Sequence, residues 1–305
     1  MAFLGSIPCP TFNTRYHVEF YRKTLTFQEP NYSEIPDKNQ IAIKVLFSML
    51  DVRSIIYCWK AILFDATLVL ISSQYSLQFY IAQALLQLLF PLAFQGGYVQ
   101  PGRNEKVGLF SSPIPIIFAC SHHAGDFEYF EMKGEEIGRD NVAICDIDGS
   151  FTNNLKFPEL EDEKRMLRSL SALKNFRGAK SDSAFEESYA EEMKAQEKNF
   201  AIDVRYQFYG VLNQFLKLIP EKQCFRDVEP DEEKVFIYTF NSEKYLDWFE
   251  DTGNYEFAKR LITSQMFATF VDNYFDKDIS NMLIYMNITS NGFDFEADET
   301  MKIAF

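Results

Sequence analysis

The stretch "TLVLISSQYSLQFYIAQALLQLLF", Thr67 to Phe90, decides the fold class of this chain of 305 residues. It begins with a short run of β-branched and apolar residues, Thr67 to Ile71, which predicts a buried strand. A helix follows, with Ser76 as its predicted N-cap and Pro91 as its end. The polar positions of this helix are three glutamines, Gln78, Gln83 and Gln87. So narrow a polar stripe predicts that the helix is buried on most sides.

Elements of the same two kinds flank this stretch. "NQIAIKVLFSML" predicts a helix that ends near Leu50, and "DVRSIIYCWKAILFD" predicts a second helix with Asp51 as its N-cap. Two further apolar runs, Ile114 to Cys120 and Val142 to Cys145, predict strands. Continuous apolar strands that are separated by helices or long connections indicate a mostly parallel sheet with helices covering both faces. The predicted fold class of this region is therefore α/β.

After Pro158 the sequence becomes acidic and helical in pattern. Apolar residues recur every three or four positions in the stretches 161–176, 183–200, 201–219 and 255–275, which predicts helices with a core-facing stripe. One predicted stripe comprises Val204, Phe208, Val211, Phe215 and Leu218, and another comprises Phe257, Leu261, Ala268, Val271 and Phe275. We therefore expect an extended connector at 1–38, an α/β module at 39–157, an all-helical module at 158–275 and an acidic tail at 276–305.

Composition limits the partners of the chain. The net charge is −14, and residues 151–305 carry 19 basic against 29 acidic side chains. An acidic surface disfavours nucleic acids and anionic membranes, whereas it permits a basic protein partner. The sequence has no signal peptide and no run of about 18 uncharged apolar residues, so we expect membrane contact to be peripheral at most. The five cysteines form no C-x-x-C pair, which indicates reduced thiols in the cytosol.

One motif suggests catalysis. In "VAICDIDGSFTNN", Val142 to Asn154, a strand leads into Asp146 and Asp148, as in phosphatases of the haloacid dehalogenase type. Such a site also needs a Lys, a Ser or Thr and further magnesium-binding carboxylates on later strands, and the downstream sequence is helical in pattern. A Mg²⁺-dependent phosphatase with Asp146 as nucleophile is therefore a remote alternative. The preferred interpretation is that both carboxylates end a strand and bind backbone N–H groups of a turn.

Other chemical motifs are weaker. "CSHHAGD" contains Cys120, His122, His123 and Asp126, but adjacent histidines rarely bind one ion and no second ligand cluster follows. The chain has no G-x-S-x-G, no G-x-x-x-x-G-K-[ST] and no G-x-G-x-x-G sequence. We therefore expect no metal, no cofactor and no covalent catalysis, which favours a protein-binding role.

The order and spacing of these patterns resemble the DENN-domain family. Leu46-Phe47, "LVLISSQYSL" and "ALLQLLFPL" resemble the family's central module, with Phe94 where the family usually has Trp. "SSPIPIIFAC" and "VAICDIDGS" resemble the strands that follow in that module. "VRYQFYGVLNQFL" and "LITSQMFATFVDNYF" resemble the family's downstream helical module, with Ser264 in place of Thr.

The family usually begins with a longin-like lobe, and here "IPCPTFNTRYHVEF" already resembles the segment that follows this lobe. We therefore expect a truncated gene model, a fragment, or a family member without the first lobe. The resemblance implies a guanine-nucleotide exchange factor, or part of one, for a Rab-type small GTPase in vesicle trafficking. It implies a cytoplasmic regulator that partners recruit to vesicle or endosomal membranes, with weak or no exchange activity if the first lobe is missing.

An alternative is a DENN-like scaffold or adaptor that binds small GTPases without exchanging their nucleotide. The expected contact residues lie in two loops at one end of the sheet, which are Ser72, Ser73, Gln74 and Tyr75, and Gln95, Gly96, Gly97 and Tyr98. These residues would equally well do no more than terminate their elements. Neither the GTPase nor the oligomeric state follows from the sequence.

Overall fold

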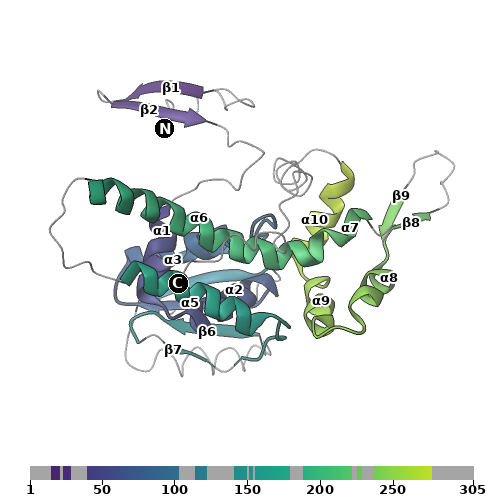
Figure 1. Cartoon of the computed structure of the whole chain (residues 1–305). Coiled ribbons are helices and arrows are strands. Elements are labelled where there is room, and N and C mark those ends of the chain that lie inside the picture. The colour runs from purple at the N-terminus through teal and green to yellow at the C-terminus, as the bar shows by residue number, and fades with distance from the viewer. Residues whose placement is uncertain are drawn as a thin grey trace.

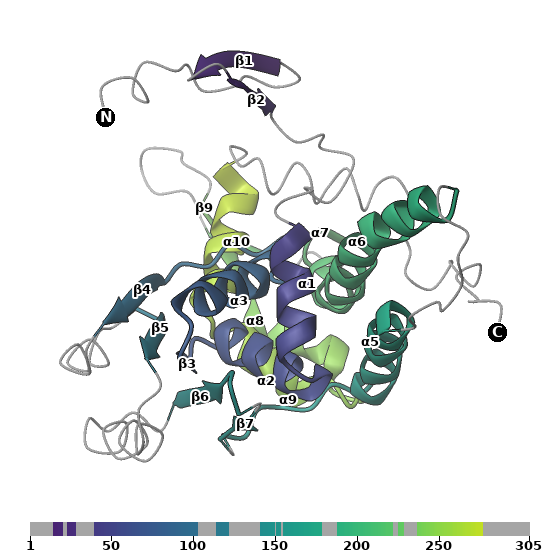
Figure 2. The same cartoon turned by 90° about the vertical axis from the view of Figure 1, so that its left-hand side faces the viewer.

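The central feature of the fold is a five-stranded sheet with the strand order β4-β5-β3-β6-β7 (Figures 1 and 2). In this computed structural model the described residues are 15–20, 23–28, 40–102, 114–121, 141–149, 151–153, 155–178, 188–221, 225–228 and 237–276. The strands are β3 (Thr67–Ser72), β4 (Gly97–Gly102), β5 (Ile116–Ser121), β6 (Val142–Asp146) and β7 (Phe151–Thr152). The first four strands in the spatial order are parallel, and β7 pairs antiparallel with β6. The prediction of a mostly parallel sheet is confirmed, while β4 and β7 were not foreseen.

The two faces of the sheet belong to different clusters of apolar side chains. Leu68 and Leu70 of β3 face the helices and join the main core, whereas Val69 and Ile71 face the other way with Phe118 of β5. Of the described side chains outside this second cluster, only Val99 packs against it. Helices α2 (Val52–Leu63) and α3 (Tyr75–Gln87) both contact the first face. Within the described residues, the predicted cover of helices is therefore present on this face alone.

The predicted start of α2 is confirmed, and the predicted start of α3 is wrong. Asp51 caps α2, because its Oδ1 accepts hydrogen bonds from the backbone N–H groups of Arg53 (2.8 Å) and Ser54 (3.0 Å). Burial alone would raise the pKa of Asp51, but the hydrogen bonds from Ser54 and Arg53 lower it below the ordinary value. Helix α3 begins two residues earlier than expected, and its N-cap Gln74 makes no capping hydrogen bond through its side chain.

The region after Pro158 is helical, as predicted, except for one hairpin. Its helices are α5 (Glu163–Gly178), α6 (Ser188–Leu216), α7 (Leu218–Glu221), α8 (Ser242–Leu246), the 3₁₀ turn η3 (Asp247–Phe249), α9 (Tyr255–Leu261) and α10 (Gln265–Asp276). Strands β8 (Phe225–Val228) and β9 (Ile237–Phe240) pair antiparallel, so the region is not all-helical. Two of the predicted stretches are one long helix, α6, and the last predicted helix is divided into α9 and α10.

The break between α9 and α10 lies at Ser264, whose Oγ accepts a hydrogen bond from the backbone N–H of Phe267 (3.3 Å). This capping interaction begins a new helix and changes which side chains face the core. Ala268, which the predicted stripe placed inside, is exposed. Met266 and Phe267 are buried in its place.

The segment predicted as an extended connector, 1–38, contains a hairpin. Strands β1 (Arg15–Phe20) and β2 (Lys23–Gln28) pair antiparallel, so this chain segment is extended but hydrogen-bonded to itself. Residues 277–305, which include nearly all of the predicted acidic tail, lie outside the described residues.

One continuous core joins the α/β region to the helices that follow it. Trp59 of α2 packs against Phe208 of α6 and Phe257 of α9, with ring centroids 5.3 Å and 6.3 Å away. Helix α1 (Gln40–Met49) contacts both α3 and α6. The predicted boundary at residue 157 therefore marks a change of secondary structure but no break in the core. The cysteines among the described residues, Cys58, Cys120 and Cys145, are free and buried.

Candidate partner-binding surface

The carboxyl ends of the parallel strands form one side of the sheet, which we call the carboxyl edge. Hydrogen bonds from the loop after β3 hold this edge together. The hydroxyl of Ser72 donates to Oδ1 of Asp148 (2.8 Å), and the backbone N–H of Ser73 donates to Oδ2 of the same carboxylate (2.7 Å). The backbone N–H of Gln74 in turn donates to the Ser72 Oγ (3.0 Å). The first predicted contact loop is therefore a rigid connection between β3 and the end of β6.

Asp146 closes the turn after β6. Its Oδ1 accepts hydrogen bonds from the backbone N–H groups of Asp148 and Gly149, each at 3.1 Å. A Cβ atom on Gly149 would lie 2.8 Å from the Asp146 Oδ2, so a larger residue there would displace this carboxylate. Asp146 thus binds backbone N–H groups of the turn after β6, whereas the carboxylate of Asp148 binds the loop after β3. Both contacts agree with the preferred interpretation of "DIDG" as the end of a strand.

Gln78 of α3 also holds the carboxyl edge together, through hydrogen bonds inside the core. It is fully buried, and its Nε2 donates to the backbone carbonyls of Leu70 (3.2 Å), Ser72 (3.3 Å) and Cys120. These carbonyls belong to β3 and β5, so one amide ties both strands to the helix that covers them. The sequence marked Gln78 only as a polar interruption. The sequence feature that could have indicated this role is a glutamine in the first turn of an apolar helix that directly follows a buried strand.

One predicted contact loop lies at the carboxyl ends of the strands and the other lies at the amino ends. The expectation that both loops lie at the same end of the sheet is therefore wrong. Ser72 pairs with Ser121 at the carboxyl edge, whereas Gly97 pairs with Ile116 at the amino edge. Gln95 and Gly96 immediately precede β4, and Gly97 and Tyr98 begin it rather than forming a turn. Because β4 runs parallel to β3, the loop before it cannot meet the loop after β3.

Exposed aromatic side chains occur beside the carboxyl edge. Tyr75 and Phe79 are 59% and 46% exposed and lie four residues apart on α3, which places them on one side of the helix. Tyr98 of β4 packs against Phe79, with the two ring centroids 6.3 Å apart, and burial raises the pKa of the Tyr98 hydroxyl. We call Tyr75 and Phe79 the aromatic patch. The sequence pointed to Tyr75 and missed Phe79, because so apolar a helix was expected to be buried.

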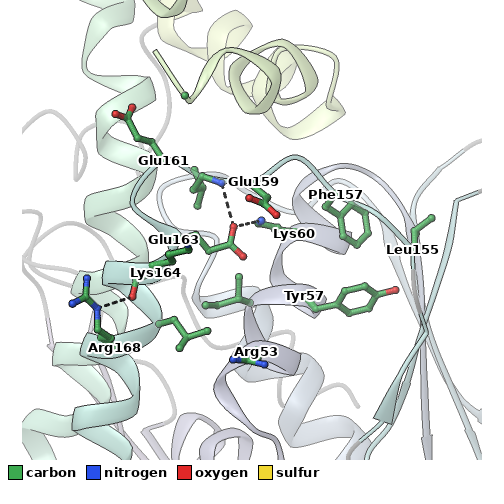
Figure 3. A pocket seen from close by; sticks show the side chains of 14 residues that line it. Arg53, Tyr57, Lys60, Leu155, Phe157, Glu159, Glu161, Glu163, Lys164 and Arg168 are labelled. Carbon is green, nitrogen blue, oxygen red and sulfur yellow. Dashed lines mark hydrogen bonds and ion pairs between the residues drawn. The ribbon is translucent and has the colours of Figure 1, made fainter.

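A second surface feature is a groove between α2 and α5 with a volume of about 970 Å³ (Figure 3). Lys60 and Glu163 form an ion pair at its base, and the Lys60 Nζ also donates to the carbonyl of Pro158 (2.8 Å). Lys60 is only 4% exposed, so the carboxylate compensates a charge that water cannot reach. The sequence did not indicate this groove, because its walls come from helices about 100 residues apart.

The other candidate residues bear less on function. His122, His123 and Asp126 lie outside the described residues, and Cys120 is buried in β5. Among the residues that the structure describes, no three His, Cys, Asp or Glu side chains come together as metal ligands would. None of the described helices is both long and apolar enough to cross a bilayer.

Comparison with known proteins identifies the first half of the chain. Residues 1–150 match the family model of the DENN (AEX-3) domain. A DENN domain-containing protein of Schizosaccharomyces pombe is 30% identical over 145 residues, which is 47% of this chain and 14% of that protein. The likeness of the later helices to the family's downstream module lies beyond the matched residues and stays a prediction. Through residues 1–150, this chain belongs to the DENN-domain family.

Proposed function

We propose that this chain binds a Rab-type small GTPase and promotes the release of its GDP. The DENN match carries this proposal, since the family implies regulation of such GTPases. The chain spans only 14% of the curated relative, so the activity is inferred from the domain and not from that whole protein. We further infer that the chain works in the cytoplasm and reaches vesicle membranes through its partners.

Nucleotide exchange needs no covalent step. An exchange factor that binds the nucleotide-free GTPase more tightly than the loaded form lowers the barrier to GDP release. It does so by holding the switch segments away from the phosphates and Mg²⁺. The work is done by interface energy, and a specific interface buries roughly 1,200–2,000 Å² of surface.

The aromatic patch is our candidate for the centre of this interface. Aromatic side chains dominate the binding energy of protein interfaces, and polar groups around them exclude water. Tyr75 and Phe79 are exposed, and Ser73 and Gln74 lie beside them at the N-terminus of α3. The hydrogen bonds of Asp148 to Ser72 and Ser73 fix the loop in advance, which reduces the entropy lost on binding. Gln95, Gly96 and Gly97 lie at the other edge, and we leave them out of the proposed interface.

The test is a GDP-release assay with a panel of Rab-type GTPases loaded with a fluorescent GDP analogue. We expect the chain to accelerate release from at least one GTPase and to bind its nucleotide-free form preferentially. The double variant Tyr75→Ala/Phe79→Ala should weaken binding at least tenfold, or about 1.4 kcal/mol. Ile41→Ala is the matched control, because Ile41 is an apolar side chain that is 62% exposed on a different helix, α1.

The outcomes separate the candidate functions. Equal affinity for the nucleotide-free and nucleotide-bound GTPase, without faster GDP release, would favour the alternative of a scaffold without exchange activity. A patch variant that binds like Ile41→Ala would move the interface elsewhere on the molecule. No binding to any GTPase of the panel would contradict the proposal.

A further inference from the structure

The groove between α2 and α5, called the α2–α5 groove, is a surface feature that the proposed function leaves unused. The residues from α2 are Arg53, Ile56, Tyr57 and Lys60, which recur at the spacing of one helix face. The opposite wall comes from Leu160 and the first turns of α5, where Leu167 and Arg168 lie. Two helices that flank an open groove offer the geometry in which proteins bind short amphipathic segments.

The base of the groove is apolar and its buried charges are already compensated. Ile56 and Leu160 are buried, and Tyr57, Phe157 and Leu167 are partly exposed towards the open space. The Lys60–Glu163 ion pair below them leaves no net charge at the base. An occupant therefore has to bring apolar side chains to this surface, which a small soluble anion does not do.

The two ends of the groove carry opposite charge (Figure 3). Arg53 and Arg168 lie at one end and are exposed, and Lys164 is exposed along the α5 wall. Within the described part of the chain, no carboxylate forms an ion pair with these three side chains. Glu159 and Glu161 are exposed at the other end.

The segment "GFDFEADETMKIAF", Gly292 to Phe305, has the matching chemistry. It carries Phe293 and Phe295, then a run of carboxylates, and then Lys302 before Ile303 and Phe305. Its charges therefore run from acidic to basic, as an occupant of a groove with one basic and one acidic end requires. A segment of the same chain is also present at a higher effective concentration than a separate partner, which favours binding within the chain.

We propose that the α2–α5 groove binds the segment 292–305 of this chain, with the carboxylates of the segment towards Arg53 and Arg168. Lys302 then lies towards Glu159 and Glu161, and the phenylalanines cover the apolar base. An anionic membrane is the weaker candidate, because Glu159 and Glu161 flank the groove and the whole chain carries a charge of −14.

Hydrogen exchange of the full chain measures this contact. We expect backbone amides of 292–305 to exchange roughly tenfold more slowly in the wild type than in Arg53→Glu/Arg168→Glu. Both arginines are exposed, so the double variant should keep its fold, which circular dichroism checks. Arg165→Glu is the matched control, because Arg165 is exposed on α5 but does not line the groove.

A charge swap decides the orientation. Adding Asp294→Lys and Glu296→Lys to the arginine double variant should restore the slow exchange.

Equal exchange in the wild type and the double variant would overturn the proposal, as would protection that Arg165→Glu abolishes to the same extent. Protection that grows with protein concentration would assign the segment to a second copy and also overturn it. Loss of binding to phosphatidylserine vesicles in the double variant, without a change in exchange, would assign the groove to a membrane instead.

Discussion

Helices α2 and α3 cover the same face of the sheet, yet their burial is the reverse of what their sequences suggest. Ten of the twelve residues of α2 are buried, including Lys60. Helix α3 is almost wholly apolar, but only five of its thirteen residues are buried, and the aromatic patch faces solvent. An apolar helix that is left half exposed marks a binding surface, and a charged residue that is buried marks a structural contact.

The difference comes from what lies on the far side of each helix. Beyond α2 lie α5 and the aromatic rings of α6 and α9, which Trp59 and Phe64 contact. Among the described elements, α3 has the sheet, α1 and α2 as neighbours, and Tyr75 and Phe79 remain exposed on its other side. Burial of these two helices is thus decided by segments that lie up to about 200 residues away in the sequence.

The largest expected effect is the loss of Trp59. Trp59→Ala removes its contacts with Phe208 and Phe257 and the hydrogen bond from its Nε1 to the Leu88 carbonyl (3.1 Å). We expect the free energy of unfolding in urea to fall by about 3–5 kcal/mol. The control is Trp248→Ala, because Trp248 is 46% exposed and its loss should cost less than about 1 kcal/mol. Equal losses of stability in Trp59→Ala and Trp248→Ala would contradict the distinction between a buried and an exposed aromatic side chain.

The next effect concerns the charge buried beneath α2. Glu163→Ala leaves the Lys60 ammonium without its carboxylate, and we expect a loss of about 2 kcal/mol in urea unfolding. This is below the range for a fully buried pair, because the Glu163 side chain is 29% exposed. Glu161→Ala, an exposed neighbour, should change stability by less than about 0.5 kcal/mol. Lys60→Met/Glu163→Leu should regain most of the loss, since no charge is then left unpaired.

Asp65, in the turn after α2, should make the stability of the fold depend on pH. Its backbone φ is 56°, and its Oδ2 accepts a hydrogen bond from the backbone N–H of Gln265 (2.6 Å) at the start of α10. Burial raises its pKa above 3.8, so the folded state holds this proton more tightly than the unfolded state does. The contribution of Asp65 to stability therefore falls as the pH rises from 3.8 through the folded-state pKa, and it stays low above that value.

Asp65→Asn removes the charge, keeps a hydrogen-bond acceptor and tolerates the positive φ. We expect the variant to equal or exceed the wild type at pH 7 by up to about 1 kcal/mol, and this advantage should shrink near pH 4. Urea midpoints at the two pH values measure it. An advantage for the wild type that grows towards pH 7 would show that the charged form is favoured instead.

The smallest expected effect on stability belongs to the aromatic patch. Phe79→Ala should change the free energy of unfolding by less than about 1 kcal/mol, because the side chain is 46% exposed and its ring contacts are with Tyr80 and Tyr98. A loss as large as that of Trp59→Ala would show that α3 is a core helix after all. The binding assay described above then decides whether the patch has a partner.

Local patterns predicted most elements of the α/β region, because caps and apolar runs depend on neighbouring residues. Asp51 marked the start of α2, and the strands β3, β5 and β6 followed from β-branched and apolar runs. Ser264 shows the limit of such patterns. The apolar period continues through it, but its capping hydrogen bond ends that period and moves Ala268 to the surface.

The candidate surfaces were predicted less well than the elements. The sequence pointed to Tyr75 and to both loops, but it placed the loops together, because it does not show which edge of the sheet each loop reaches. Phe79 was missed because exposure depends on what covers a helix. The groove was missed because Arg53 and Arg168 meet only when α5 packs beside α2.

By itself, the sequence determined the parallel α/β region, the helical region after Pro158 and the likeness to the DENN family. These follow from local periodicity, capping and the order of motifs, which short-range sterics and hydrogen bonds control. Only the tertiary structure decided that both regions share one core, that Asp148 holds the loop after β3, and that Lys60 is buried while Phe79 is not. Burial and pairing depend on contacts between residues far apart in the chain, and these contacts exist only once the layers have packed.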